Sequence, residues 1–338
     1  MALLSPENEV NYQKFVDAFV EMPIATTIMA DFDRLRYNRK FGGDQQCMLL
    51  TGDTGCGKSF LIHEYCRRVN LKTALDTLLI LSSRIPSKPT LDSTIIELLK
   101  DIGHSFATYR KGKSGDQALT ESLIKCLKST EVELIIINEF QELVEFKSGK
   151  ALSEIATRLK YISEEAAVPI VLVGMPWSVK IAKEPQWASR LLIRRRLSYF
   201  TLSKEPEEFI RFIKGLAIRM PFDEPPKLDD KHTILSLFAT SKGQIRTLKH
   251  FMNEAVKIAL EQNFPTLSNQ QLAKTYHLMF PDLPNPFHQS IEQIEGQEVS
   301  VTSHYDSGAD NEFDAVIPTK YTDLLPLSQL LRQTRKTK

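Results

Sequence analysis

The sequence predicts an α/β fold in which a parallel sheet of five strands, layered between helices, precedes a smaller all-helical unit. Two observations support this prediction. Apolar runs rich in β-branched residues alternate with helical patterns as far as residue 203. From Glu205 onward the strand signals stop and only helical periodicity follows. Alternation of this kind implies strand–helix–strand crossovers, and therefore a layered α/β domain followed by a helical one.

The expected strands are short apolar runs at 47–51, 77–82, 133–137, 169–174 and 198–202. The first four lack the alternation of a half-exposed strand, as expected when both faces of a parallel sheet are covered. Helical patterns follow the first strand at 60–66 and then occur at 91–102, 117–129 and 151–166. Beyond the last strand they occur at 206–219, 229–239, 243–262 and 268–279.

The order of these elements predicts four segments. Residues 1–45 form an N-terminal helical lead, 46–203 the α/β nucleotide-binding core, and 204–280 a helical lid. Three prolines follow within the six residues 281–286, and after them come a polar acidic stretch and a basic end. We therefore expect residues 281–338 to be a flexible tail that docks a partner or folds only on one.

Length and composition are those of a globular protein with two compact domains and a tail. The chain has 338 residues, 42% of them apolar and 25% charged. Its formal net charge of +1 gives no bulk attraction to nucleic acid or membranes, so DNA contact requires local basic patches. Four cysteines without metal-ligand spacing suit free thiols in a reducing compartment. With no signal-like N-terminus and no apolar run of about 18 residues, we expect a cytoplasmic protein without membrane contact.

The strongest motif fills every fixed position of a phosphate-binding loop. Its residues are Gly52, Asp53, Thr54, Gly55, Cys56, Gly57, Lys58 and Ser59. The glycines let successive backbone N–H groups point at a β-phosphate, and the helix that follows adds its positive end. Lys58 supplies a charge to the β- and γ-oxygens, and the Ser59 hydroxyl is the expected Mg²⁺ ligand. The motif predicts binding of a nucleoside triphosphate with Mg²⁺.

A second nucleotide signal ends the third expected strand, where Asn138 and Glu139 follow four apolar residues. It looks like the second Walker motif, with Asn138 at the position that ordinarily holds a Mg²⁺-associated Asp. Asn138 keeps an acceptor oxygen for the nucleotide and its metal but has no charge, so we expect weaker metal binding and slow hydrolysis. Glu139 is placed to polarise the attacking water and is the expected catalytic base. The alternative interpretation is that the pair only caps the strand.

A parallel-sheet nucleotide domain followed by a small helical lid is the AAA+ arrangement, which suggests roles for two arginines. Arg246, in the first turn of a lid helix, is placed to reach the γ-phosphate as a sensor, or it is a solvated surface residue. Arg190, before the fifth strand, is the candidate arginine finger that enters a neighbouring subunit's site. Its competitors for that role are Arg194, Arg195 and Arg196. The segment 174–176 after the fourth strand offers no side-chain donor for the first sensor.

Over about residues 10–290 the chain resembles the TnsC/TniB family of AAA+ regulators of DNA transposition. The resemblance rests on the lead 19–25, the phosphate-binding loop, Asn-Glu-x-Gln at 138–141, Val-Gly-x-Pro at 173–176, and Ser-Arg-Leu at 189–191. Family members usually have Asp-Glu at 138–139 and often Thr at 175, so this chain departs from the family at both places. Neither departure removes the nucleotide pocket.

The resemblance implies an ATP-dependent homo-oligomer, a ring or a helical filament around duplex DNA, that links a target-selection protein to a transposase. Independent support comes from the loop 109–115, where Arg110, Lys111 and Lys113 concentrate charge on a Gly-containing segment, as contacts to the DNA backbone require. Such contacts carry little sequence preference. The alternatives are an ordinary solvated loop, a signalling or remodelling ATPase that acts on proteins without DNA, and a nucleotide-gated scaffold with little hydrolysis.

Overall fold

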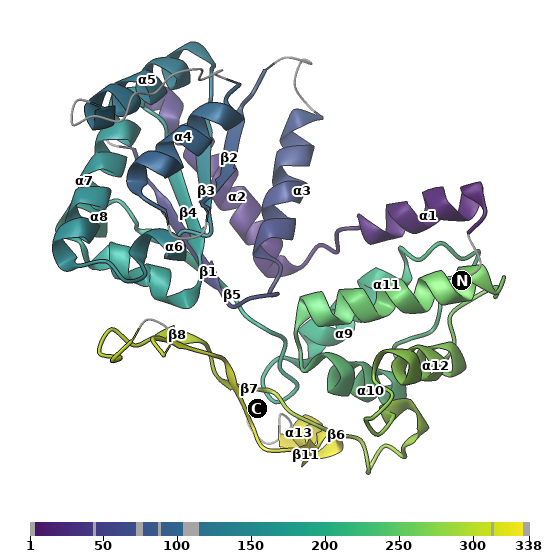
Figure 1. The fold of residues 1–338 in the computed structure, drawn as a ribbon. Helices are drawn as coiled ribbons and strands as arrows, with labels where there is room; N and C mark the ends of the chain where they lie inside the picture. The colour runs from purple at the N-terminus through teal and green to yellow at the C-terminus, as the bar shows by residue number, and fades with distance from the viewer. Residues whose placement is uncertain are drawn as a thin grey trace.

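The structure, a computed structural model, describes residues 4–42, 45–71, 77–86, 89–103, 115–311 and 314–333. Two lobes lie side by side, an α/β lobe on the left of Figure 1 and a helical lobe on the right. The main sheet contains β1 (Met48–Gly52), β2 (Ile80–Arg84), β3 (Leu134–Asn138), β4 (Ile170–Gly174) and β5 (Ile193–Leu197). All four strand pairs are parallel, and the order is β2-β3-β4-β1-β5. The expected five-stranded parallel sheet is confirmed.

Helices cover both faces of this sheet. Along β1, Met48 and Leu50 belong to the hydrophobic core on the side of α2 (Pro23–Asn38) and α3 (Lys58–Asn70). Leu49, between them, belongs to the core on the other side. That second face is covered by α4 (Leu91–Asp101), α5 (Gly115–Ser129) and α7 (Gly149–Ala166). Successive strand residues point to opposite faces, so a strand buried on both needs the continuous apolar run that this sequence has.

The fifth strand differs from the expectation at 198–202. β5 is the preceding arginine-rich segment, which pairs with β1 through Ile193 opposite Met48. It has a neighbour on one side only, and as an edge strand it leaves Arg194 and Arg196 exposed while Leu197 is buried. An edge strand therefore needs no continuous apolar run, which is why the sequence pattern placed it too late. Residues 198–202 instead lead the chain into the helical lobe.

Shorter elements connect the strands and helices of the α/β lobe. The connecting elements are η1 (Arg39–Phe41), α6 (Gln141–Val144), η2 (Pro176–Lys183) and α8 (Pro185–Ala188).

The two helices of the N-terminal lead pack against different lobes. Helix α2 packs on the sheet, whereas α1 (Pro6–Val16) lies along the helical lobe (Figure 1). There the Lys249 ammonium donates to the carbonyl of Phe15 at the end of α1, at 2.7 Å. The lead therefore bridges the two lobes.

The helical lobe contains α9 (Pro206–Ala217), α10 (Lys231–Ser241), α11 (Ile245–Glu261) and α12 (Asn269–Met279). Each agrees with its expected helix to within two residues at either end. Local caps define several of these ends: the Asp230 carboxylate accepts from Thr233 N, and Ser268 forms a capping box with Gln271. The aromatic side chains Phe209 and Phe238 pack edge to face inside the lobe, with ring centroids 5.2 Å apart.

After residue 281 the described residues differ from the expected flexible tail. They form η3 (Pro286–His288), β6 (Glu295–Gly296), β7 (Val299–Val301), β8 (His304–Tyr305), β9 (Val316–Ile317), β10 (Lys320–Tyr321), β11 (Leu325–Pro326) and α13 (Leu327–Gln333). The strands pair antiparallel as β6 with β11, β7 with β10 and β8 with β9. We call residues 295–326 the C-terminal hairpin. In Figure 1 it runs beneath the lobes, from the helical lobe toward the α/β lobe.

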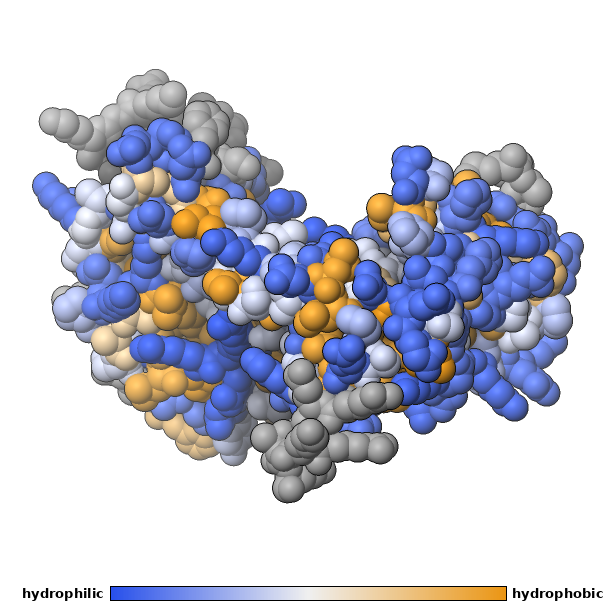
Figure 2. All heavy atoms as spheres, turned by 90° about the horizontal axis from the view of Figure 1, so that it is seen from below, coloured by the Kyte–Doolittle hydropathy of each residue, from blue (hydrophilic) through white to orange (hydrophobic). Residues whose placement is uncertain are grey.

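The buried anchors of this segment explain its order. Phe287, Ile294, Leu327 and Leu330 all belong to the main hydrophobic core. Phe287, Ile294 and Leu327 are too widely spaced for any local periodicity to reveal them, and only the antiparallel pairing of β6 with β11 brings the two ends of the hairpin together. Hydrophobic side chains also show at the surface between the lobes when the molecule is seen from below (Figure 2). Within the described ranges, none of the helices combines the length and apolarity needed to cross a bilayer.

Candidate functional site

The phosphate-binding loop lies between the end of β1 and the start of α3, as its motif predicts. Gly55 and Gly57 have φ of 79° and 97°, the left-handed region in which glycine is unstrained. A side chain on Gly52 would place its Cβ 2.5 Å from the Leu197 carbonyl oxygen, so a glycine is required there for close packing against β5. Backbone conformation and packing thus explain the glycines without reference to a ligand.

Lys58 is buried, and its ammonium donates to the carbonyl oxygens of Gly52 at 2.7 Å and Asp53 at 3.0 Å. These bonds hold the charge in the centre of the loop. Ser59, the next residue, is exposed on the first turn of α3. Burial raises the pKa of the Cys56 thiol, which therefore stays neutral and is a packing residue of the loop rather than a nucleophile.

The end of β3 brings Asn138 and Glu139 to the same loop. The Asn138 amide nitrogen donates to the Ser59 hydroxyl at 3.2 Å, and its amide oxygen accepts from Glu139 N at 3.0 Å. Glu139 lines the cavity that the phosphate-binding loop also lines. Its backbone has φ of 60°, which non-glycine residues rarely adopt. The two nucleotide motifs, far apart in the chain, therefore face one cavity.

The donor set fits a Mg²⁺–nucleotide complex rather than a metal site built by the protein alone. In the part of the chain that the structure describes, no group of three or more His, Cys, Asp or Glu side chains is placed to hold a metal ion. Mg²⁺ bound with a nucleotide takes most of its ligands from phosphates and water, and needs only one or two from the protein. The Ser59 hydroxyl fits that role. Asn138 presents its amide nitrogen to Ser59, and it would have to turn its amide over to offer oxygen to a metal.

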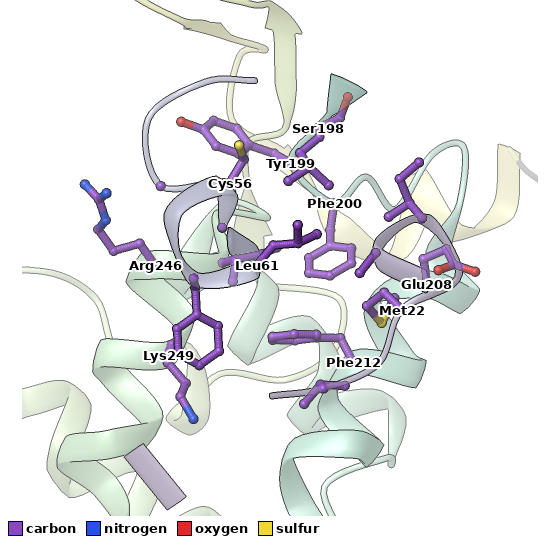
Figure 3. A pocket seen from close by; sticks show the side chains of 18 of the residues that line it. Met22, Cys56, Leu61, Ser198, Tyr199, Phe200, Glu208, Phe212, Arg246 and Lys249 are labelled. Atoms are coloured by element: carbon purple, nitrogen blue, oxygen red, sulfur yellow. The ribbon is translucent and has the colours of Figure 1, made fainter. Parts of the chain in front are cut away.

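The cavity, about 1560 Å³ in volume, lies between the lobes. One wall is the phosphate-binding loop, and the others come from the N-terminal lead, the segment after β5, and helices α9 and α11. Figure 3 shows Met22, Phe200 and Phe212 gathered on one side of the loop, with Arg246 on the other. A polar phosphate cradle beside an apolar recess suits a nucleotide, because the recess accepts the base while the loop holds the phosphates.

The first turn of α11 is bonded directly to the phosphate-binding loop. Arg246 N donates to the Gly55 carbonyl at 3.0 Å, and its side chain is exposed at the cavity. Nearby, the Tyr199 hydroxyl donates to the Thr54 carbonyl and accepts from the Gln244 amide nitrogen, the latter at 3.0 Å. Burial raises the pKa of Tyr199 to about 12, which keeps this donor protonated. The lid and the loop thus form one hydrogen-bonded unit, and Arg246, the residue predicted to act as a sensor, lines the same cavity as the loop.

Arg190 is held inside its own chain. Its guanidinium pairs with Glu164 and donates to the Gln45 carbonyl at 3.4 Å, and the side chain is only 9% exposed. Gln45 precedes β1, whereas the phosphate-binding loop follows it, so Arg190 lies at the opposite end of the sheet from the loop. To reach a neighbouring subunit it would first have to leave Glu164. The expected role of Arg190 as an arginine finger therefore gains no support from this arrangement.

The competing arginines divide into two kinds. Arg195 is paired with Asp31 of α2, with 2.6 Å between Nε and Oδ2. Arg194 and Arg196 point to the other side of the edge strand and are exposed, and Arg196 also lines the cavity. The basic residues expected to contact DNA, Arg110, Lys111 and Lys113, lie outside the described residues.

Sequence reasoning missed the contact between the C-terminal hairpin and the nucleotide loops. Ser303 donates to the buried Asp53 carboxylate through its backbone N–H, at 3.2 Å, and through its hydroxyl. Two residues further on, the Tyr305 hydroxyl accepts from Phe146 N at 2.9 Å, and the Lys180 ammonium lies 3.7 Å from its ring centroid. The sequence carries no signal for these contacts, because they join residues of no recognisable motif across more than a hundred positions.

The strand order, the loop after β1 and a helical lid bonded to that loop define an AAA+ P-loop fold. The comparison with solved structures agrees. The ORC2 protein of Aeropyrum pernix, in its ADPNP-ADP complexes, has 17% identity and a TM-score of 0.57, with 78% of this chain and 70% of that chain covered. Cdc6p of Pyrobaculum aerophilum has 13% identity and a TM-score of 0.57, with 80% and 74% covered. At these identities the likeness shows the fold alone.

The chain belongs to the TniB family. The family model described as bacterial TniB protein matches residues 12–199, more than half of the chain, which confirms the resemblance seen in the motifs. The ORC1 protein of Aeropyrum pernix, solved in complex with DNA, is a further structural neighbour, with 14% identity, a TM-score of 0.57, and 80% of this chain and 70% of that chain covered. No curated protein matches the sequence.

Proposed function

We propose that the protein is an ATP-dependent regulator of DNA transposition that assembles on duplex DNA as a ring or helical filament. The observation that carries this proposal is the hydrogen bond between the lid and the phosphate-binding loop, Arg246 N to Gly55 O, in a member of the TniB family. A nucleotide bound between those two elements touches both lobes, and it can therefore set their relative position. Family resemblance adds the partners, a target-selection protein and a transposase.

In this proposal each part of the cavity has one task. The backbone N–H groups of residues 52–59 bind the phosphates of ATP, and Lys58 exchanges its bonds to the loop carbonyls for bonds to phosphate oxygens. The apolar recess around Met22, Phe200 and Phe212 takes the base. Mg²⁺, when bound to the nucleotide, neutralises phosphate charge, and the Ser59 hydroxyl would hold it, with Asn138 as a candidate second ligand. Arg246 then senses the γ-phosphate from the lid side.

Hydrolysis is assigned to Glu139, whose carboxylate accepts the proton of the attacking water. Because Asn138 lacks the negative charge that usually holds the metal at this place, we propose that turnover is slow and that ATP binding, rather than hydrolysis, drives assembly. In the assembly, each subunit would insert an arginine into the nucleotide site of the neighbouring subunit. Arg194 is better placed for this than Arg190, because it is exposed and its guanidinium donates to the Leu191 carbonyl, whereas Arg190 is paired with Glu164. Arg196 is also exposed but lines the cavity of its own chain.

DNA binding is proposed on two grounds. The loop that carries Arg110, Lys111 and Lys113 has the composition of a backbone-contacting segment, and backbone contacts are largely independent of sequence. In addition, a structural neighbour, ORC1 of Aeropyrum pernix, was solved with DNA bound. The proposed assembly would encircle or follow the duplex, and its end would present the docking surface for the transposase.

Electron microscopy and sedimentation of the protein mixed with duplex DNA, with and without a non-hydrolysable ATP analogue, test the proposal. We expect assemblies only when DNA and analogue are both present. Lys58→Ala should abolish them, because the charge on the phosphates is lost, while Lys150→Ala, at an exposed position on α7, should not. A wild-type protein that stays monomeric with saturating DNA and analogue would overturn the proposal.

A nucleotide-gated scaffold with little hydrolysis is the second candidate, favoured by Asn138. It shares with the first proposal the expectation that assembly on DNA persists in Glu139→Gln, and it differs in predicting wild-type turnover barely above background. Assembly that requires continued hydrolysis excludes it.

A further inference from the structure

Gln141 joins the ends of two neighbouring strands at the nucleotide site. It is the first residue of α6 and is buried. Its amide nitrogen donates to Glu139 Oε2 at 2.7 Å, and its amide oxygen accepts from Met175 N at 3.1 Å. Glu139 follows β3, and Met175 follows β4. A single side chain therefore ties the carboxylate assigned to hydrolysis to the backbone of the adjacent strand.

The direction of this amide is determined by chemistry. A backbone N–H can only donate, so Met175 N requires the amide oxygen, and the nitrogen must then face Glu139. Glu139 in turn offers a carboxylate that only accepts. Glutamine satisfies both neighbours at once. Glutamate at this position could still accept from Met175 N but would place a second negative charge against Glu139. Methionine, of similar length, has no donor for Glu139 and offers Met175 N only a weak acceptor.

The surroundings of Gln141 leave its amide little freedom. A Cβ on Gly174 would overlap the Ser178 hydroxyl, and it would lie 2.9 Å from the Gln141 amide oxygen, closer than real Cβ atoms come, and 3.0 Å from Gln141 N. Glycine at the end of β4 thus makes the space that the amide occupies. On the other side, Glu139 is held in the left-handed backbone conformation, with φ of 60°, which persists only where neighbouring contacts maintain it.

We propose that Gln141 is a positioning residue for ATP hydrolysis, an inference that rests on the proposed ATPase function. Its amide occupies Oε2 of Glu139, which orients the carboxylate and leaves Oε1 to accept a proton from water. The water oxygen then forms a bond to the γ-phosphorus while the bond from that phosphorus to the β–γ bridging oxygen breaks. The electron pair of that bond stays on ADP, inorganic phosphate is released, and Glu139 later returns its proton to solvent.

Steady-state hydrolysis by the full-length protein, together with equilibrium binding of a non-hydrolysable ATP analogue, tests this role. Gln141→Glu keeps the bond to Met175 N and removes the donor to Glu139, so kcat should fall by about 100-fold, as misplacement of a catalytic group does. Analogue affinity and KM for ATP should stay within about threefold of wild type, because the phosphate-binding loop is untouched. Gln141→Met, with no charge to repel Glu139, should show the same split between kcat and KM.

A double-mutant cycle separates positioning from a structural effect. If Gln141 acts only through the carboxylate of Glu139, Glu139→Gln combined with Gln141→Glu should be no slower than Glu139→Gln alone. If the two substitutions lower kcat by factors that multiply in the double variant, the inference is overturned. It is also overturned if kcat is unchanged in both single variants at position 141. If Gln141→Glu does not fold, Gln141→Met carries the same comparison, with thermal unfolding and analogue binding as the checks of folding.

The outcomes also separate this inference from the proposed function. If Glu139→Gln abolishes hydrolysis but both variants at position 141 turn over normally, the positioning role is wrong and the ATPase assignment stands. If the wild type does not hydrolyse ATP, or if Glu139→Gln hydrolyses it at the wild-type rate, the assignment of Glu139 is wrong and the role of Gln141 is overturned with it.

Discussion

Ser303 donates two hydrogen bonds to one oxygen of Asp53, through its backbone N–H at 3.2 Å and through its hydroxyl, although the two residues are 250 positions apart. Asp53 is the second residue of the phosphate-binding loop and is buried. Ser303 belongs to the C-terminal hairpin, which lies outside the part of the chain that matches the TniB family model. A segment beyond the family match therefore supports the loop that binds phosphate.

Removal of this support should destabilise the fold. Ser303→Ala leaves the buried Asp53 carboxylate with one donor fewer, and we expect the free energy of unfolding to fall by about 1–3 kcal/mol. Denaturation by urea at neutral pH measures the difference. Ser307→Ala, at an exposed position of the same hairpin, is the matched control and should have little effect. Equal stability of the two variants would show that the bond contributes nothing.

The stability of the lid should depend on Gly243, which lies beside the segment that connects the two lobes. Gly243 has φ of 77°, and a Cβ there would lie 2.1 Å from the Phe200 carbonyl oxygen. Gly243→Ala should therefore lower the free energy of unfolding by at least about 2–3 kcal/mol, from backbone strain and displacement of Phe200 together. Gly308→Ala is the control, because among the described residues a Cβ there would meet only Asp306, at 3.4 Å. Thermal unfolding of both variants decides the point, and a Gly243→Ala protein as stable as its control would contradict it.

Lys249 should make stability depend on pH. Burial lowers its pKa to about 8, and the charge of nearby Asp17 only partly opposes this shift. Between about pH 8 and the unfolded value near 10.5, the unfolded chain holds a proton that the folded protein has lost, so the free energy of unfolding should rise with pH. Urea denaturation at about pH 7.5 and about pH 9.5 measures this rise.

In Lys249→Met the contribution of this group to the rise should disappear. Lys257→Met, on the same helix but paired with Glu254, is the control and should keep it. An identical pH dependence in wild type and Lys249→Met would mean that the ammonium keeps its ordinary affinity for protons despite its burial.

Replacement of Arg110, Lys111 and Lys113 together by Ala should weaken DNA binding to the same extent for unrelated sequences. Each lost phosphate contact lowers the slope of log affinity against log salt by about 0.9, so the slope should fall by about 2–3. Fluorescence anisotropy with labelled duplexes over a range of salt concentrations measures it, in the presence of an ATP analogue. A slope equal to that of the wild type would place the DNA surface elsewhere on the protein.

Much of the fold can be predicted because its signals are local. The phosphate-binding loop is a contiguous motif, and within one segment α11 shows its apolar stripe and α12 its capping box. Two predictions were wrong for the same reason. The fifth strand was placed at 198–202 rather than at Ile193–Leu197, and residues after 281 were expected to be flexible. In both cases the stabilising contacts come from distant parts of the chain.

The order of residues is therefore sufficient to establish the class of fold, the nucleotide loop and the presence of a lid, since each depends on neighbours in the chain. Only folding decides which of several similar side chains faces the cavity. Arg190 is paired with Glu164 while Arg196 lines the nucleotide cavity, and Gln141 contacts both Glu139 and Met175. Such choices depend on packing between separate strands and helices, and the free energy of packing comes from contacts that no local pattern records.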